Sequence, residues 1–372
     1  MTETGNNARS PRILIAGGGT GGHVIPALAI AREVQDRAGA EVLFVGTERG
    51  LETRLVPEAG FPLELIHVGQ LKNVSLATQL RTLMDLPLGL VRCVKLLRSF
   101  RPDAVMGVGG YASGPAMMAA ILLRIPTLAF EPNAIPGLAN RMVGGRVTAA
   151  AVNFEESRCY FRGARVTGTP VRPEFFAIGK RPVDGRKRLL VFGASQGARV
   201  LNERMPKIMG RLLNAFPDMD VVHQTGGRHG DSTLLAYEDA GIAFERVTVT
   251  PYLDDMAEQF EAADLILCRS GASTMAELAA AGRASVLVPF PQASDDHQRK
   301  NADAFVAAGA AEMVPEDELS EERLFDVLSK LLTDGPRREK MAARVRKLAH
   351  PDAVKVIGEM VLTLAGRRAH LK

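Results

Sequence analysis

The chain has 372 residues, of which 46% are hydrophobic and 24% charged, a composition typical of globular proteins and sufficient for two domains. A net charge of +4 says little about nucleic acid, but no tryptophan and 5% aromatic residues argue against nucleic-acid binding, because base stacking needs aromatic side chains. Three widely separated cysteines exclude a disulfide scaffold. We expect no signal peptide and no membrane-spanning helix, since no apolar run approaches the roughly 18 residues of a span.

One pattern occurs four times along the chain: a short apolar strand, a loop rich in glycine or hydroxyl groups, and a helix rich in alanine and leucine. The strands are predicted at 12–16, 104–106, 188–192 and 264–268, and their loops at 17–23, 107–115, 193–198 and 269–274. Strands alternating with helices form parallel sheets that bind ligands at the carboxyl ends of their strands. The sequence therefore predicts an α/β fold with two Rossmann-like, doubly wound domains.

These modules fall two on each side of a charged stretch, 179–188, which looks like a surface segment. We expect a first domain at 1–168 and a second at 169–350. The helical pattern within 351–372 is expected to return to the first domain.

The first glycine-rich loop, Gly17–His23, satisfies the dinucleotide fingerprint G-x-G-x-x-G between a strand and a helix. Such a loop presents backbone N–H groups to phosphate, although a tight turn without ligand is the plain alternative. A nicotinamide enzyme is disfavoured, because the expected acidic ribose ligand is poorly placed, with Glu48 the nearest candidate. His23, just ahead of the helical residues from Pro26 onward, could act as a general base or only cap or pack.

The fourth module leaves two interpretations of one carboxylate open. Ser273 and Thr274 lie where a helix is expected to begin, and Glu277 follows three residues after Thr274. This spacing fits a capping box, but it also fits a carboxylate that binds two ribose hydroxyls. In the next polar loop Asp295–His297 lack a second histidine or cysteine partner, so no metal site is predicted.

Eight short motifs occur in an order that identifies a resemblance. They are GGTGGHVIPALAIA (18–31), GVGGYASGP (107–115), EPNAIPGLANR (131–141), GTPVR (168–172), GASQGA (193–198), YLDDM (252–256), RSGASTMAELAAAG (269–282) and DDHQRKNA (295–302). The chain resembles, over nearly its whole length, the MurG family of bacterial N-acetylglucosaminyltransferases. Pro132, Thr169 and Ala194 depart from the family's usual Gln, Asn and Gly.

The resemblance implies a GT-B fold with the active site in a cleft between two domains. It implies UDP-N-acetylglucosamine (UDP-GlcNAc) as donor and undecaprenyl-pyrophosphoryl-N-acetylmuramyl pentapeptide as acceptor, joined through an inverted β-1,4 linkage without cofactor or metal. A peripheral position on the cytoplasmic face of the bacterial inner membrane is expected, with an anionic membrane surface and other cell-wall synthesis or division proteins as further partners. The alternative is another GT-B enzyme that uses a UDP-sugar, with a different lipid acceptor or as an epimerase.

The resemblance also implies the residues that bind the donor. They are Thr20, Gly21, Gly22, Asn133, Arg172, Ser195, Leu253, Ala272, Ser273, Thr274, Glu277 and Gln298. Among these, Thr20–Gly22 and Asn133 are expected to reach the donor from the first domain. Glu277 is expected on the ribose and Leu253 near the uracil. Ser195 and Arg172 are expected near the diphosphate, and Gln298 on the sugar.

The residues that bind the acceptor are predicted from the anion-binding character of two glycine-rich loops. The candidates for the acceptor pyrophosphate are Gly18, Gly19, Gly109, Gly110, Tyr111 and Ser113. His23 is the candidate base for the acceptor 4-hydroxyl.

Residues 71–101 carry six basic residues against one acidic residue, and leucines recur there at helical spacing. An apolar helix face beside basic residues suits an anionic membrane surface. Membrane contact is predicted for Leu76, Leu80 and Leu83. Beyond Pro87, which separates two apolar runs, Val94 and Leu97 are expected to pack on the sheet instead.

Overall fold

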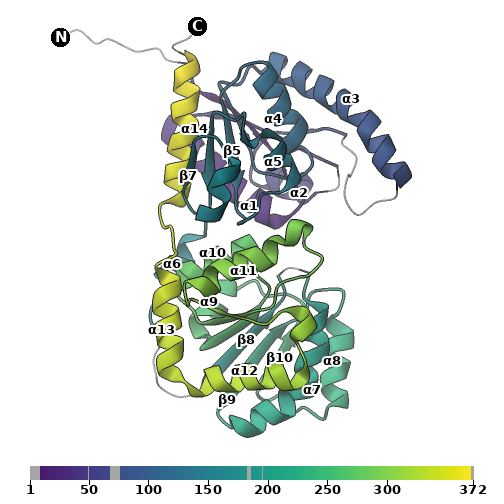
Figure 1. Ribbon diagram of the computed structural model, residues 1–372, viewed down its shortest axis with the longest axis vertical. Helices are drawn as coiled ribbons and strands as arrows, with labels where there is room; N and C mark the ends of the chain where they lie inside the picture. Colours follow the sequence, from purple (N-terminus) through teal and green to yellow (C-terminus); the bar gives the residue numbers. More distant parts are fainter. Residues whose placement is uncertain (1–8, 49, 68–75, 182–185, 195, 370–372) are drawn as a thin grey trace, which may run out of the picture. The chain divides into compact units, whose positions relative to one another are not determined.

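Figure 1 shows the computed structural model of the chain, which describes residues 9–48, 50–67, 76–181, 186–194 and 196–369. For 76–86 and 367–369 it describes the backbone alone. The chain divides into two compact units. The first comprises residues 1–132, 136–170 and 352–372, and the second comprises 133–135 and 171–351.

The first unit is built on a seven-stranded parallel sheet in the order β3-β2-β1-β4-β5-β6-β7. Its strands are β1 (Arg12–Ala16), β2 (Glu41–Gly46), β3 (Leu63–Leu65), β4 (Ala104–Gly107), β5 (Thr127–Glu131), β6 (Ala149–Val152) and β7 (Ala164–Val166). Its helices are α1 (Gly21–Ala38), α2 (Glu52–Glu58), α3 (Leu76–Phe100), α4 (Ser113–Leu122), α5 (Leu138–Gly144), the 3₁₀ helix η1 (Glu155–Tyr160) and α14 (Ala353–Ala369). The strand order reverses between β1 and β4, which is where doubly wound sheets bind their ligands.

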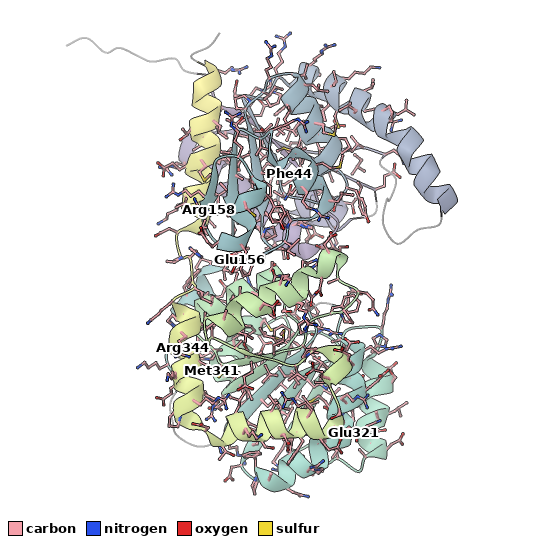
Figure 2. All side chains as sticks on the ribbon, in the orientation of Figure 1. Phe44, Glu156, Arg158, Glu321, Met341 and Arg344 are labelled. Carbon is pink, nitrogen blue, oxygen red and sulfur yellow. The ribbon has the colours of Figure 1, made fainter. Side chains whose placement is uncertain are left out.

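Helices cover both faces of this sheet, and alternate residues of β1 divide between them. Ile13 and Ile15 belong to a core shared with α1 and α14, whereas Leu14 belongs to a core shared with α3 and α4. Figure 2 shows Phe44 of β2 inside the unit, with its ring 5.5 Å from that of Phe61. Each such fully buried side chain contributes about 1.5–3 kcal/mol relative to exposure.

The second unit repeats this plan with a six-stranded parallel sheet in the order β10-β9-β8-β11-β12-β13. Its strands are β8 (Lys187–Phe192), β9 (Met219–Gln224), β10 (Val247–Thr250), β11 (Leu265–Cys268), β12 (Ser285–Leu287) and β13 (Glu312–Met313). Its helices are α6 (Pro173–Ala177), α7 (Arg199–Ala215), α8 (Gly230–Asp239), α9 (Met256–Ala262), α10 (Ala272–Ala281), α11 (His297–Ala307), α12 (Glu321–Thr333) and α13 (Gly335–Arg346), with 3₁₀ turns η2 (Ser294–Asp296) and η3 (Glu316–Glu318). Here the order reverses between β8 and β11.

The predicted fold class is confirmed, since both sheets are parallel and doubly wound. Val94 and Leu97 pack against the core of the first sheet, as expected. In contrast to the expected division into two runs, α3 continues through Pro87 as one helix. Within the described residues, no helix combines the length and hydropathy that crossing a bilayer requires.

Candidate functional site

The loops after β1 and β4 pack backbone against backbone at the switch point of the first sheet. The Gly18 amide donates to the Gly109 carbonyl over 3.3 Å. A Cβ on Gly17 would collide with that same carbonyl oxygen, and one on Gly110 would lie 2.5 Å from the Gly18 carbonyl oxygen. All four glycines have positive φ. A side chain at Gly17 or Gly110 would therefore separate the two loops.

His23 lies in the first turn of α1 and faces the loop after β4. Its Nε2 is 3.1 Å from the Cβ position of Gly109, and its Nδ1 is 3.3 Å from Thr20 Oγ1. We expected His23 ahead of a helix that starts near Pro26, but α1 already begins at Gly21. Gly21 and Gly22 lie in the first turn of α1, where backbone N–H groups have no acceptor within the helix.

The amides of the first glycine loop are largely bonded inside the protein. Gly17 donates to the Val45 carbonyl over 3.0 Å, and Gly19 donates to the Glu52 carboxylate over 2.6 Å. Gly18 and Gly19, both predicted for the acceptor pyrophosphate, thus already have acceptors for their N–H groups. The sequence interpretation missed Glu52, whose one signal is its place just after the carboxyl end of the neighbouring strand, β2.

The loop after β4 offers a hydroxyl group at a helix N-terminus. Ser113 is the first residue of α4 and is 1% exposed, and its Oγ has no hydrogen-bond partner among the described residues. Tyr111, two residues earlier, is exposed. A buried hydroxyl without a partner is uncommon in folded proteins, which makes Ser113 a candidate for binding a polar group.

In the second unit the structure distinguishes the two interpretations of Glu277. Helix α10 begins at Ala272 with Gly271 as N-cap residue, and no side chain caps it. Glu277 therefore lies in the second turn, too far along the helix for the capping box that the spacing allowed. Its carboxylate is left for another role, and Ser273 and Thr274 lie in the first turn.

The surroundings of Glu277 favour its protonated form. Burial raises the pKa of this carboxyl to about 7, although the nearby Arg172 opposes the shift and Glu174 adds to it. Arg172 lies at the N-terminus of α6, which packs on α10. Its guanidinium is 3.2 Å from the Glu174 carboxylate and stacks over the Phe175 ring at 5.0 Å. The second unit thus places the Glu277 carboxyl, whose pKa is near 7, close to the Arg172 guanidinium.

Gln298 lies in the first turn of α11, and its side-chain oxygen already accepts a hydrogen bond. Its Oε1 accepts the Phe290 amide over 3.0 Å, and its backbone carbonyl accepts the Ser270 hydroxyl over 2.8 Å. The side-chain NH₂ is consequently the end that can donate to a ligand. Just before it, Asp295 and Asp296 both have positive φ, and such strained residues cluster at ligand sites.

A buried arginine fixes the start of the same loop. Arg269 donates to the carbonyls of Val288 and Pro289 over 3.1 and 3.0 Å, and it pairs with Glu316 at 2.6 Å. Its burial lowers the pKa of the guanidinium, an effect that the Glu316 carboxylate opposes. The segment that presents Gln298 is therefore anchored at both ends.

Asn133 belongs to the second unit, although it was expected to act from the first domain. Its Oδ1 accepts from Asn301 Nδ2 over 3.2 Å, and Asn301 Oδ1 accepts the Ala134 amide over 2.8 Å. Asn301 is fully buried and also donates to the Ser270 carbonyl. The sequence could not reveal this, because 133–135 is a short segment between two stretches of the first unit.

The remaining candidates are placed only in part. Leu253 lies half-buried in the loop after β10. Ser195 and the side chains of Leu76, Leu80 and Leu83 lie outside the described residues. Within the part of the chain that the structure describes, no group of three or more His, Cys, Asp or Glu residues is placed to hold a metal ion.

Comparison with known proteins adds to this geometry. Residues 13–152 match the glycosyltransferase family 28 N-terminal domain, and residues 188–357 match the corresponding C-terminal domain. The chain is 44% identical over 362 residues to the UDP-N-acetylglucosamine--N-acetylmuramyl-(pentapeptide) pyrophosphoryl-undecaprenol N-acetylglucosamine transferase of Anaeromyxobacter sp. strain Fw109-5, covering 96% of this chain and 94% of that protein. The crystal structure of Acinetobacter baumannii MurG matches at TM-score 0.81 and 30% identity, covering 95% of this chain and 99% of that one.

The chain belongs to the MurG family of glycosyltransferases. A UDP-GlcNAc 2-epimerase from Neisseria meningitidis, solved with UDP-GlcNAc bound, matches at TM-score 0.63 but only 14% identity, covering 95% of this chain and all of that one. That likeness shows the shared fold alone. The expected family and the GT-B fold are therefore confirmed.

Proposed function

We propose that this chain transfers N-acetylglucosamine from UDP-GlcNAc to the 4-hydroxyl of undecaprenyl-pyrophosphoryl-N-acetylmuramyl pentapeptide, with inversion at the anomeric carbon. The observation that carries the proposal is the relative at 44% identity over 96% of the chain, whose name states this sugar donor and this lipid-linked acceptor. The family resemblance supplies the hydroxyl and the stereochemistry.

The second unit takes the donor. The Glu277 carboxylate accepts hydrogen bonds from the two ribose hydroxyls, a role supported by its freedom from helix capping. Arg172 lies beside it for the diphosphate, and Gln298 donates its NH₂ group to the sugar. Other expected contacts follow from the family resemblance: Leu253 on the uracil, Ser195 on the diphosphate, and Ala272, Ser273 and Thr274 along the pocket.

The first unit takes the acceptor. The pyrophosphate of the acceptor binds at the loop after β4, where the buried Ser113 hydroxyl has no hydrogen-bond partner among the described residues. The N–H groups at the start of α1 supply further donors. Gly18 and Gly19 shape this region rather than donate to it, because their amides are bonded to Gly109 and Glu52.

The reaction is a single displacement. His23 removes the proton from the acceptor hydroxyl while that oxygen attacks the anomeric carbon of the donor. The bond from this carbon to the diphosphate oxygen breaks, and its electron pair leaves with UDP. Arg172 and the N-terminus of α7 stabilise the negative charge that grows on the leaving group.

We also propose that α3 and α4 form the face that meets the membrane. Leu88 and Val91 on α3, and Met118 and Leu122 on α4, are large apolar side chains exposed to solvent. On α3 the exposed Arg92 and Lys95 continue the same stripe. The two helices pack on each other. Where α4 ends, Arg124 and Arg146 line a pocket of about 200 Å³, and basic groups of this kind suit an anionic lipid surface.

UDP release tests the function directly. Purified protein is mixed with UDP-GlcNAc, with and without the lipid acceptor, and each mixture is repeated with a chelator. Acceptor-dependent UDP release in equal yield with chelator, together with a product heavier by one N-acetylhexosamine, is expected. Release of UDP or formation of an epimer without acceptor would contradict the proposal.

A further inference from the structure

We infer that Glu52 is a positioning residue for the proposed transfer: its carboxylate fills the anion cradle of the first glycine loop and thereby fixes Thr20 and His23. The inference rests on the proposed function, in which His23 is the base. In this inference, the glycine-rich fingerprint of the first unit binds a carboxylate of the protein itself where a dinucleotide-binding loop would bind phosphate.

The Glu52 carboxylate joins the loops that follow β1 and β2. Its Oε2 accepts the Gly19 amide over 2.6 Å. Its Oε1 accepts the Thr47 amide over 2.9 Å and the Thr47 hydroxyl over 3.1 Å. The residue is 1% exposed. Three donors converge on one buried carboxylate, and bonds to a charged group are worth about twice those between neutral groups.

Glycines line the space that this side chain occupies. A Cβ on Gly18, on Gly46 or on Gly50 would overlap atoms of the Glu52 side chain. Gly18 follows β1, Gly46 ends β2, and Gly50 precedes α2. The three glycines thus come from two stretches of the chain, the loop after β1 and the connection from β2 to α2, and surround one carboxylate. A cradle of this shape accepts a planar two-oxygen anion, and here the protein itself supplies it.

Gly19 and Thr20 connect the Glu52 carboxylate to His23. Gly19 is held from both sides, because its N–H donates to Glu52 and its carbonyl accepts the Leu51 amide over 3.3 Å. The next residue, Thr20, accepts the His23 amide at its carbonyl over 3.1 Å and places its Oγ1 3.3 Å from His23 Nδ1. Gly19 has φ +93°, so without the carboxylate this peptide has many other conformations.

The side-chain amide of glutamine cannot replace the carboxylate. Gly19 and Thr47 approach opposite oxygens of Glu52, each with an N–H group. In Glu52→Gln one of them must face the NH₂ group, so at least one bond is lost. Thr47→Val is the matched control, since it removes one hydroxyl bond to the same carboxylate and leaves the Gly19 bond intact.

The experiment measures three quantities: kcat with donor and acceptor both saturating, UDP affinity, and the unfolding temperature. The variants are Glu52→Gln and Thr47→Val, each with and without His23→Gln. We expect Glu52→Gln to lower kcat about 10- to 100-fold, as a displaced catalytic group does, and Thr47→Val to lower it less than about 3-fold. UDP affinity should stay unchanged, because the residues proposed for the uridine and the diphosphate, Glu277, Leu253 and Arg172, lie in the second unit. On top of His23→Gln, Glu52→Gln should add less than about 3-fold, because both changes act on the same proton transfer.

Several outcomes would overturn the inference. These are wild-type kcat in Glu52→Gln, an equal loss of kcat with and without His23, or a parallel loss of UDP affinity. If Glu52→Gln fails to fold, Gly19→Ala is measured in the same cycle, since it strains the same peptide while a Cβ there meets no atom within 4 Å. Should the wild-type protein itself show no acceptor-dependent UDP release, the proposed function fails, which is a separate result.

Discussion

Glu277 combines a raised pKa with a role that requires its charged form. Burial raises the pKa of the carboxyl to about 7, and a protonated carboxyl accepts hydrogen bonds from ribose hydroxyls far less well. UDP affinity should therefore rise with pH and level off above the pKa. We expect binding at pH 6 to be about tenfold weaker than at pH 8, measured by calorimetry.

The control for that pH dependence is Glu277→Gln, which cannot titrate. This variant should bind UDP weakly, with an affinity that hardly changes between pH 6 and 8. Two bonds to a charged acceptor are at stake, so the loss at pH 8 should reach about 30-fold or more. An unchanged pH profile in Glu277→Gln would assign the titration to another group.

Among the substitutions proposed here, the largest fall in kcat is expected at His23. Replacing it with alanine removes the proposed base, so kcat should fall by about 10²- to 10⁴-fold. UDP binding should stay near the wild-type value, because His23 lies in the first unit and Glu277, Leu253 and Arg172, proposed for the uridine and the diphosphate, lie in the second. The measurement is acceptor-dependent UDP release beside a UDP titration. Near-normal turnover would remove His23 from the role.

Ala194 has a φ of +61°, in the left-handed region. L-residues other than glycine are disfavoured there by about 1 kcal/mol. Ala194→Gly should therefore stabilise the second unit by a similar amount, seen as a higher unfolding temperature by circular dichroism. Ala304→Gly, inside α11, is the same substitution with the opposite expected sign. A lower unfolding temperature for Ala194→Gly would contradict this account.

At the scale of elements, α3 and α4 carry the membrane prediction. Leu88 is 63% exposed and Val91 51% exposed, one helical turn apart. Replacing both with glutamate adds two negative charges and removes the apolar surface, so binding to vesicles of anionic phospholipid should drop about tenfold or more. Leu235→Glu on α8, also an exposed leucine, should leave binding unchanged. Equal binding of all variants would exclude this face.

The sequence predicted the elements whose periodicity is strong and local. The central strands β1, β4, β8 and β11 and the helices after them stood out, because buried parallel strands are continuous apolar runs. The edge strands were missed: β3 is short and largely exposed, so it shows neither an apolar run nor alternation.

The sites were predicted less completely, for a physical reason. Residues on one short segment, such as Ser273 and Glu277 of α10, share a motif and can be recognised together. Glu52 and Gly19 are brought together only by the pairing of β1 with β2, and no local pattern records that pairing. The start of α1 was also missed, because a run of glycines gives no helix signal although Gly21 and Gly22 are helical.

At the scale of the whole molecule, the first unit is completed by the end of the chain. Helix α14 packs on α1, and Ile357, Val361 and Leu364 are buried there. Burying each of these side chains contributes about 1.5–3 kcal/mol, so removing all three would cost an amount close to the whole free energy of unfolding of a domain.

Truncation after Pro351 should therefore unfold the first unit and spare the second. Limited proteolysis with mass spectrometry should recover a resistant fragment near 171–351 that still binds UDP. A resistant fragment covering 9–170 in the truncated protein would show that the first unit folds without α14.

This return of the chain also sets an order for biosynthesis. A ribosome releases the glycine loops and His23 early, yet the helix that covers the sheet behind them emerges only after the whole second unit. The half that begins first is therefore finished second, and until α14 has been made the α1 surface that it covers stays exposed.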